Sequence, residues 1–213
     1  KVEDVESFIK TFEPIVIKHF KKEYSKFYKT GKNLISFEMS KKIIRSFLKN
    51  ELDFLKSSDS PLFIKSNEEN LACEMTLNIN GKSKQVKLKG IADRIDQFEG
   101  GYRIIDYKTG KVGSREVNLK DVSQIKDKAK AMQLMLYAYM FFQIKPEINE
   151  VSSHIFALRN IKHTNFPLAI NKDSVLSKNQ MPEVEAIIAE IIEDMYSDSP
   201  LEHNEKAVYC GYC

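Results

Sequence analysis

Residues 90–110 read Gly90-Ile91-Ala92-Asp93-Arg94-Ile95-Asp96-Gln97-Phe98-Glu99-Gly100-Gly101-Tyr102-Arg103-Ile104-Ile105-Asp106-Tyr107-Lys108-Thr109-Gly110, and this stretch decides the fold. Two β-rich runs flank a glycine-containing turn, which is the signal of a β-hairpin. With the turn centred between Glu99 and Gly100, Phe98 faces Gly101 across the hairpin. The same register fixes the partner of every other residue in the two strands.

One face of this hairpin carries chemistry. Asp93 faces Asp106, and directly opposed residues share a face with Cβ atoms ~4.5–5.5 Å apart. Two carboxylates so close repel each other unless a cation lies between them or one is protonated. Lys108 lies two residues past Asp106, so strand alternation puts it on the same face. The pattern indicates a divalent-metal site with a cationic neighbour.

On the opposite face of the hairpin, the residue types indicate a structural role rather than a catalytic one. Asp96 faces Arg103, which is an ordinary cross-strand ion pair, and Arg94 faces Ile105. A β-bulge at Gly100-Gly101 is the open alternative, because a slip of one residue moves every side chain to the other face.

A second hairpin precedes the first. Residues 71–79 alternate like a strand, Asn80-Gly81 is a two-residue turn, and the return strand begins near Lys84. Glu74 then faces Lys87, and two interpretations stay open: an ion pair, or an accessory metal ligand. Six residues along a strand span ~20 Å, so only a bend at Gly90 would bring Glu74 to Asp93.

The three motifs together resemble a family. Gly-x-x-Asp-Arg-x-Asp (90–96), Asp-Tyr-Lys-Thr-Gly (106–110) and Gln133-x-x-x-Tyr137 on a helix over residues 127–143 look like the PD-(D/E)XK nucleases of the RecB and AddB type. The resemblance is close over residues 71–142. It implies a restriction-endonuclease-like α/β fold with a mixed central sheet flanked by helices.

The resemblance also implies the roles of the residues. Mg²⁺ or Mn²⁺ is expected on Asp93, Asp106 and the backbone carbonyl of Tyr107, with Asp106 and Lys108 as catalytic residues. Gln133 and Tyr137 share a helix face at i and i+4 and are expected to contact substrate. The alternative for this pair is a polar patch on a helix surface.

A metal-ligand histidine in an N-terminal helix is a further feature of such nucleases, usually in a Gly-x-x-x-His setting. Here Ile15 stands four residues before His19. His19 is therefore either that ligand or a surface residue, in which case the ligand is expected upstream of Lys1. Because the chain starts on Lys1 inside helix-like sequence, we expect it to be part of a longer protein.

Cys210 and Cys213 form half of a metal-ligand pattern. AddB-like nucleases hold an iron–sulfur cluster with several C-terminal cysteines and one distant cysteine. Cys73 is the only other cysteine here, and three cysteines do not complete a four-ligand site. A cluster is thus expected only in a longer protein.

Composition sets the remaining limits. The 213 residues are 42% hydrophobic and 30% charged with a net charge of +3, which is ordinary for a globular protein. Residues 103–130 carry eight Lys or Arg against four Asp or Glu. Two interpretations of this basic stretch stay open: a patch that binds nucleic acid, or a solvated surface. No signal peptide or membrane-spanning run is present, and the odd cysteine count indicates a reducing cytoplasmic setting without membrane contact.

The expected organisation is an N-terminal helical region (1–58) followed by a nuclease core (59–213), together one compact domain. Helices are expected over residues 2–28 with a break at Pro14, over 34–55, over 127–143 and from Pro182 onward. Strands are expected over 61–65, 71–79, 84–98, 101–108 and 151–159, with one more near 166–170.

The expected function is metal-dependent hydrolysis of DNA, as an exonuclease in recombination and double-strand break repair with a helicase domain or partner. Three alternatives stay open: a catalytically incomplete nuclease-fold module that binds DNA or a partner, an enzyme acting on RNA, and an interaction domain whose hairpin acids are merely solvated.

Overall fold

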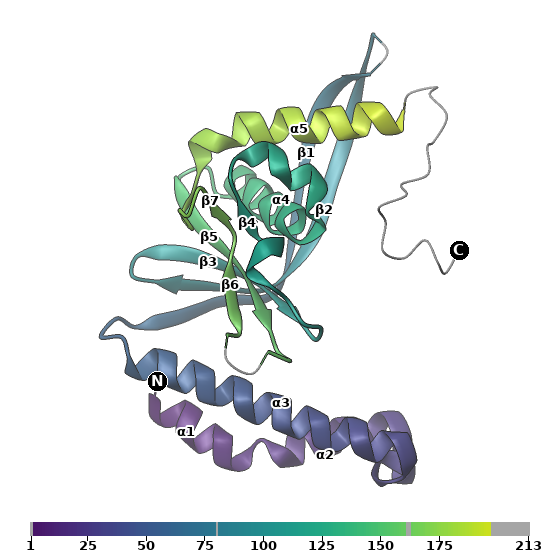
Figure 1. Ribbon diagram of the computed structural model, residues 1–213, viewed down its shortest axis with the longest axis vertical. Coiled ribbons are helices and arrows are strands. Elements are labelled where there is room, and N and C mark those ends of the chain that lie inside the picture. The colour runs from purple at the N-terminus through teal and green to yellow at the C-terminus, as the bar shows by residue number, and fades with distance from the viewer. Residues whose placement is uncertain (1, 80, 161–162, 197–213) are drawn as a thin grey trace.

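The computed structural model describes residues 2–79, 81–160 and 163–196 (Figure 1). Its helices are α1 (Val2–Thr11), α2 (Glu13–Tyr24), α3 (Gly31–Lys56), α4 (Ala129–Ile144) and α5 (Met181–Met195), with short 3₁₀ turns η1 (Ser25–Lys29), η2 (Ser114–Glu116), η3 (Val122–Asp127) and η4 (Lys178–Gln180). Its strands are β1 (Leu62–Ile79), β2 (Lys82–Phe98), β3 (Gly101–Lys108), β4 (Asn118–Leu119), β5 (Glu150–Ala157), β6 (Asn165–Pro167), β7 (Ala169–Ile170) and β8 (Leu176–Ser177).

The central sheet is mixed and mostly antiparallel. Its strand order is β1-β2-β3-β5-β6, with β8 also pairing with β5, and only β3 and β5 run parallel. The parallel pair arises because α4 crosses over between β3 and β5. A mixed sheet flanked by helices confirms the expected α/β class and is consistent with a restriction-endonuclease-like fold.

The hairpin of β2 and β3 has the register that the sequence predicts. Phe98 pairs with Gly101, and the ladder continues through Asp96 with Arg103 to its last pair, Arg94 with Ile105. Glu99 and Gly100 both have positive φ, as a type I′ turn requires. The ladder runs without a shift, so the bulge alternative at Gly100-Gly101 is wrong.

The strand β1 is longer than predicted. The expected strands 61–65 and 71–79 are parts of one strand, which is interrupted by a register shift between Ile64 and Ser66. Glu74 pairs with Lys87, as predicted. The polar residues 66–70 concealed this continuity, because they carry no apolar alternation.

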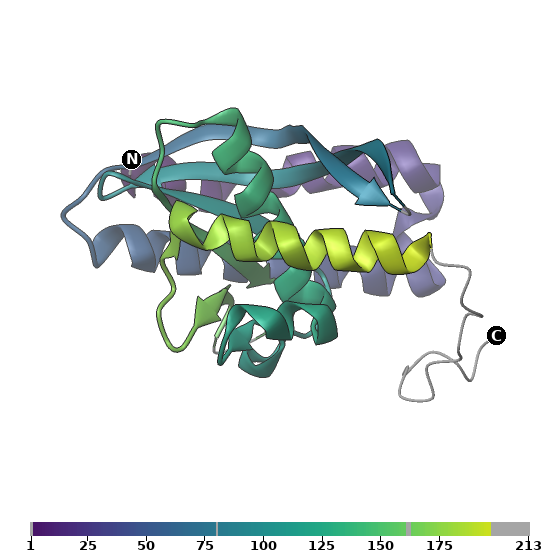
Figure 2. The same ribbon diagram turned by 90° about the horizontal axis from the view of Figure 1, so that it is seen from above.

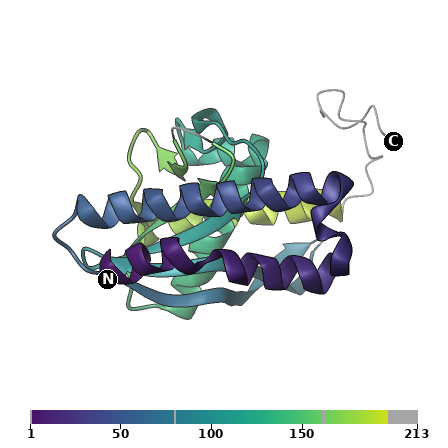
Figure 3. The ribbon, with the colours of Figure 1, turned by 90° about the horizontal axis from the view of Figure 1, so that it is seen from below.

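The helices form two layers, one on each side of the sheet. α4 and α5 lie on one side, and Figure 2 shows α5 as the outer helix there. α1, α2 and α3 lie on the other side, with α1 and α2 alongside α3 (Figure 3). α4 is apolar nearly all round and lies in the main core, whose buried residues include Leu134, Met135, Ala138 and Phe142.

The N-terminal helices differ from the prediction at one boundary. Pro14 lies in the first turn of α2, so the predicted break occurs there. α3 begins at Gly31, three residues before the expected start at residue 34. The division into regions 1–58 and 59–213 stays a prediction. Among the described helices, none combines the length and the apolarity that a membrane crossing needs.

Candidate active site

Asp93 lies where β2 and β3 separate. The β2–β3 ladder ends at Arg94 and Ile105, so Asp93 and Asp106 are not a ladder pair as the simple register implied. Instead Asp93 Oδ2 accepts a hydrogen bond of 2.6 Å from the backbone N–H of Tyr107. The half-buried carboxylate of Asp93 is thereby held against the segment that carries Asp106 and Lys108.

Asp106 is the buried acid of the site. Its Oδ1 accepts a hydrogen bond of 2.9 Å from Gln133 Nε2, and its Oδ2 lies 2.8 Å from Lys108 Nζ. Burial raises the pKa of the Asp106 carboxyl, and the negative charge of Asp93 adds to this, while Lys108 and Gln133 act in the opposite direction. The hydrogen bond from the Tyr107 N–H to Asp93 places this second acid next to the residue that follows Asp106.

Gln133 connects the members of the site. From α4, its Oε1 accepts a hydrogen bond of 2.9 Å from Lys108 Nζ, and its Nε2 donates to Asp106 and, at 2.8 Å, to the Tyr137 hydroxyl. Tyr137 is itself buried, and burial raises the pKa of its phenol. The interpretation of Gln133 and Tyr137 as a surface polar pair is therefore wrong. Gln133 hydrogen-bonds to Asp106 and Lys108, and the buried Tyr137 hydrogen-bonds to Gln133.

Gly90 allows α4 to approach strand β2 closely. A Cβ on Gly90 would lie 2.7 Å from Tyr137 Cε1 and 3.0 Å from Met140 Cε. Real Cβ atoms do not come so close to a ring carbon, so glycine at this position permits the contact. Sequence reasoning treated Gly90 only as a possible bend and missed this packing role.

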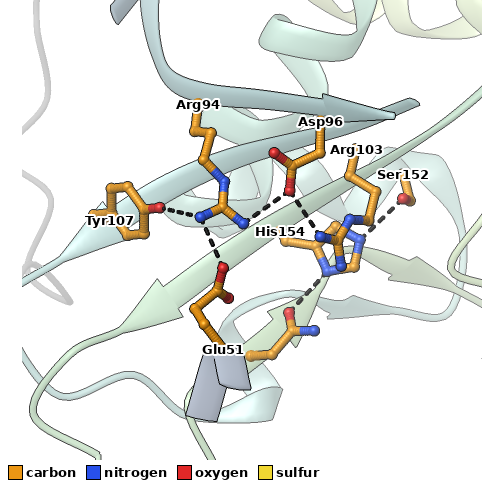
Figure 4. Close-up of polar contacts among 8 residues, drawn as sticks. Glu51, Arg94, Asp96, Arg103, Tyr107, Ser152 and His154 are labelled. Atoms are coloured by element: carbon orange, nitrogen blue, oxygen red, sulfur yellow. Dashed lines mark hydrogen bonds and ion pairs between the residues drawn. The ribbon is translucent and has the colours of Figure 1, made fainter. Parts of the chain in front are cut away.

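On the opposite face of the hairpin lies a buried polar network of Glu51, Arg94, Asp96, Arg103 and Tyr107 (Figure 4). Arg94 contacts Glu51 and the Tyr107 hydroxyl at 2.9 Å each and Asp96 at 2.8 Å, and Arg103 contacts the same Asp96 oxygen at 2.7 Å. The predicted cross-strand ion pair of Asp96 with Arg103 is confirmed, and Asp96 in it is fully buried.

The network links α3 to the strands of the site. Sequence reasoning missed Glu51, although it lies four residues after Phe47, whose ring contacts Tyr107 of the sheet. Burial disfavours the guanidinium of Arg94, but Glu51, Tyr107 and Asp96 outweigh this and raise its pKa. Burial raises the pKa of Tyr107 to about 12, so its hydroxyl stays protonated.

His154 has a structural role. Its ring nitrogens lie 2.8 Å from Asn165 Oδ1 and 2.9 Å from Ser152 Oγ (Figure 4). Burial lowers its pKa to about 4, so the ring is neutral at physiological pH. Two hydrogen bonds to neighbouring strand residues account for this side chain.

The other candidate residues lie apart from the cluster. Glu74 is exposed on β1 opposite Lys87, and none of the described contacts joins it to Asp93 or Asp106. His19 is exposed on α2, in the helical layer beyond the sheet. Cys73 is a free thiol on β1 whose pKa is raised by burial and by Glu185. Cys210 and Cys213 lie outside the described residues.

The residues present fit a divalent cation in part. Asp106 Oδ2 is buried and, apart from its ion pair with Lys108, accepts no hydrogen bond of good geometry. Asp93, Asp106 and the Tyr107 carbonyl supply oxygen ligands, which hard cations prefer. Across residues 2–79, 81–160 and 163–196, however, no group of three or more acidic, histidine or cysteine side chains is arranged to hold an ion.

Comparison with known proteins gives the family. No curated protein matches the chain. A solved structure described as "Crystal structure of SSO0001" is 13% identical over 95% of this chain and 96% of that chain, with a TM-score of 0.27. A family model described as the PD-(D/E)XK nuclease superfamily matches residues 20–213. This match spans the whole Asp93–Tyr137 cluster, and the chain belongs to the PD-(D/E)XK nuclease superfamily.

Proposed function

We propose that this protein hydrolyses phosphodiester bonds of DNA with the help of a divalent metal ion. PD-(D/E)XK nucleases generally use such ions. The observation that carries the proposal is the cluster around Asp106, where a buried carboxylate of raised pKa is ion-paired with Lys108 beside a second acid, Asp93. Carboxylates whose pKa is shifted by burial and by a specific charge partner are typical of active sites.

The residues have distinct roles in this proposal. Asp93, Asp106 and the Tyr107 carbonyl would hold the metal, which supplies Lewis-acid activation of water and of the phosphate. Lys108 places a compact positive charge where negative charge develops on the phosphate. Gln133 fixes Lys108 and Asp106 relative to each other through its two hydrogen bonds. Tyr137, bonded to Gln133, contacts substrate.

The motifs support a more specific proposal. Because the order of the Gly90–Asp96, Asp106–Gly110 and Gln133-x-x-x-Tyr137 motifs resembles RecB- and AddB-type nucleases, we place the protein in that branch. The branch implies a Mg²⁺-dependent exonuclease in recombination and double-strand break repair, working in the cytoplasm with a helicase domain or partner. An iron–sulfur cluster that includes Cys210 and Cys213 belongs to the same proposal.

A cleavage assay tests the proposal. End-labelled linear duplex, single-stranded DNA and RNA are each incubated with Mg²⁺, Mn²⁺ or EDTA, using the wild type, Asp106→Asn and the exposed-loop control Asp59→Asn. We expect metal-dependent cutting of DNA that Asp106→Asn abolishes and Asp59→Asn retains, because only Asp106 lies in the cluster. The product ladder separates an exonuclease from an endonuclease. Cutting by Asp106→Asn at the wild-type rate would refute the site.

One observation favours a second candidate function. Since only two acidic side chains meet in the described part of the site, a catalytically incomplete module that binds DNA or a partner is the alternative. It predicts DNA binding without cutting. A version extended N-terminally separates the two: cutting by the extended chain alone places the missing ligand upstream of Lys1, and binding without cutting by both supports the module.

A further inference from the structure

A cavity of about 760 Å³ lies beside the proposed active site, between the segment that follows β3 and the turn that follows β5. Its lining includes Lys111, Val112, Arg159, His163, Phe166 and Pro167. The volume falls in the range of ~300–1,000 Å³ that is usual for small-ligand sites. None of the residues assigned to the proposed catalytic cluster lines it.

The charge of the cavity is one-sided. Its lining includes the basic residues Lys111, Arg159 and His163, and none of the described residues that line it is an acid. Within the described part of the chain, these three side chains make no hydrogen bond or ion pair. By contrast, Lys130 is paired with Glu116, and Arg103 is buried in the network, so much of the basic stretch 103–130 is already engaged. The cavity therefore suits an anion.

The floor of the cavity is apolar and well fixed. Phe166 and Pro167 line it beside Val112. The Asn160 side chain clamps the backbone of Val112, donating to its carbonyl at 2.8 Å and accepting from its N–H at 3.3 Å. An aromatic ring on a fixed floor under unpaired basic groups is the combination that binds single-stranded nucleic acid.

The cavity lies close to the catalytic lysine along the chain. Lys111 follows Lys108 by three residues, at most ~11 Å of extended chain. In addition, Leu158 N–H donates a hydrogen bond of 2.9 Å to the Lys108 carbonyl, and Arg159 comes directly after Leu158. A strand whose phosphate lies at Lys108 would thus reach the cavity within a few nucleotides.

We propose that this cavity binds an unstacked nucleotide of single-stranded DNA next to the scissile phosphate. Lys111 and Arg159 contact the phosphates, and Phe166 stacks on the base. The proposal rests on the proposed nuclease function and adds to it a preference for single-stranded ends, since a paired base cannot enter the cavity.

Fluorescence anisotropy in EDTA tests the phosphate contacts without cleavage. The probe is a labelled single strand of about 12 nucleotides, within the usual site size of ~4–16. We expect Lys111→Gln/Arg159→Gln to weaken binding about tenfold or more in 0.1 M salt. The slope of log K against log salt should fall by about 1.4, the value for two lost phosphate contacts on a single strand.

A matched control carries the same change of charge elsewhere. Lys32→Gln/Lys145→Gln removes two exposed lysines outside the cavity and should bind like the wild type. Equal binding by the two double variants would overturn the proposal, and so would competition by dAMP as effective as that by the oligonucleotide. Binding is measured in EDTA and therefore does not depend on cleavage. A failure of cleavage would refute the proposed nuclease function without changing the binding result.

The stacking role of Phe166 needs a second probe. An oligonucleotide with abasic sites keeps the phosphates and lacks the bases. We expect the wild type to prefer the normal strand by about fivefold or more, and Phe166→Leu to lose most of that preference. Leucine keeps the apolar contact with the core, and an unchanged melting temperature will show that the fold is intact. Full retention of the preference in Phe166→Leu would contradict the stacking.

Discussion

The backbone N–H of Tyr107 donates a 2.6 Å hydrogen bond to Asp93, while the side chain of the same Tyr107 accepts one of 2.9 Å from Arg94 on the opposite face of the hairpin. Asp93 and Arg94, which are adjacent in β2, therefore hold Tyr107 of β3 from both faces of the hairpin. Tyr107 lies between Asp106 and Lys108 in the chain. The buried network thus positions the segment that carries the proposed catalytic residues.

Glu51→Gln tests the link between this network and α3. The substitution keeps the shape of the side chain but leaves the buried guanidinium of Arg94 with one charged partner fewer. We expect a loss of about 3 kcal/mol in the free energy of unfolding, measured by urea denaturation, because breaking one side of a buried ion pair leaves a charge uncompensated.

Glu13→Gln is the control for that experiment. Glu13 pairs with Arg45 on the exposed surface of the helical layer, where ion pairs contribute ~0–1 kcal/mol. A loss no greater for Glu51→Gln than for Glu13→Gln would show that the network does not hold α3 on the sheet.

Gly90→Ala tests the close approach of α4. The new Cβ would lie 2.7 Å from Tyr137 Cε1, so the ring must move away and weaken its hydrogen bond with Gln133. We expect a destabilisation of about 1–3 kcal/mol and slower cleavage. Thermal unfolding and the DNA assay measure the two effects.

Gly110→Ala is the matched substitution, since a Cβ there would meet nothing within 4 Å. It should be neutral or slightly stabilising, because alanine restricts the unfolded chain. If both alanine variants melt at the same temperature, the packing argument for Gly90 does not hold.

The β2–β3 hairpin was predictable because two independent signals agreed. Two β-rich runs predicted the strands, and the turn centred between Glu99 and Gly100 specified the pairs from Phe98 with Gly101 to Arg94 with Ile105. Helical spacing then placed Gln133 and Tyr137 on one face of α4. Local rules thus placed Asp106 and Lys108 on one strand and Gln133 and Tyr137 on one helix face, whereas the hydrogen bonds between strand and helix are tertiary contacts.

The remaining features depend on tertiary contacts that no local rule fixes. Glu51 meets Arg94 across 43 positions of sequence, and no local pattern singles out Glu51 as its partner. The β2–β3 ladder ends at Arg94 because the backbone N–H of Tyr107 donates its hydrogen bond to the Asp93 side chain and not to the backbone of another strand. The cavity near Lys111 is lined by the segment after β3 and by the segment from Arg159 through β6, whose relative placement the sequence pattern does not determine.

Asp106→Asn should change how stability depends on pH. The folded-state pKa of Asp106 is raised by burial and by Asp93, so its protonated form is favoured in the folded protein. The stabilisation is therefore full below the unfolded-state pKa and is lost as pH rises through the folded-state pKa. In EDTA, the variant should gain stability relative to the wild type over this interval, in urea denaturation at a series of pH values.

Added metal provides the control for the same pair of proteins. Millimolar Mn²⁺ should stabilise the wild type at neutral pH, because the cation compensates the two carboxylates, and should stabilise Asp106→Asn much less. A stability difference between the two proteins that does not vary with pH would contradict the assigned direction of the pKa shift.

Lys108→Gln tests the cation of the site. Lys108 lies 2.8 Å from Asp106 Oδ2 and lowers the pKa of that carboxyl, so its removal should raise the pKa of Asp106 further. We expect the rate of DNA cleavage to fall about 100-fold or more, as for loss of a group that stabilises developing charge. The acid limb of the pH–rate profile should also move to higher pH, since the metal-binding form of Asp106 is the ionised one.

Lys145→Gln changes an exposed lysine at the end of α4 and should leave both the rate and the profile unchanged. A lower rate with an unmoved acid limb would mean that Lys108 acts on the substrate without setting the ionisation of Asp106, and an unchanged rate would remove Lys108 from the catalytic site.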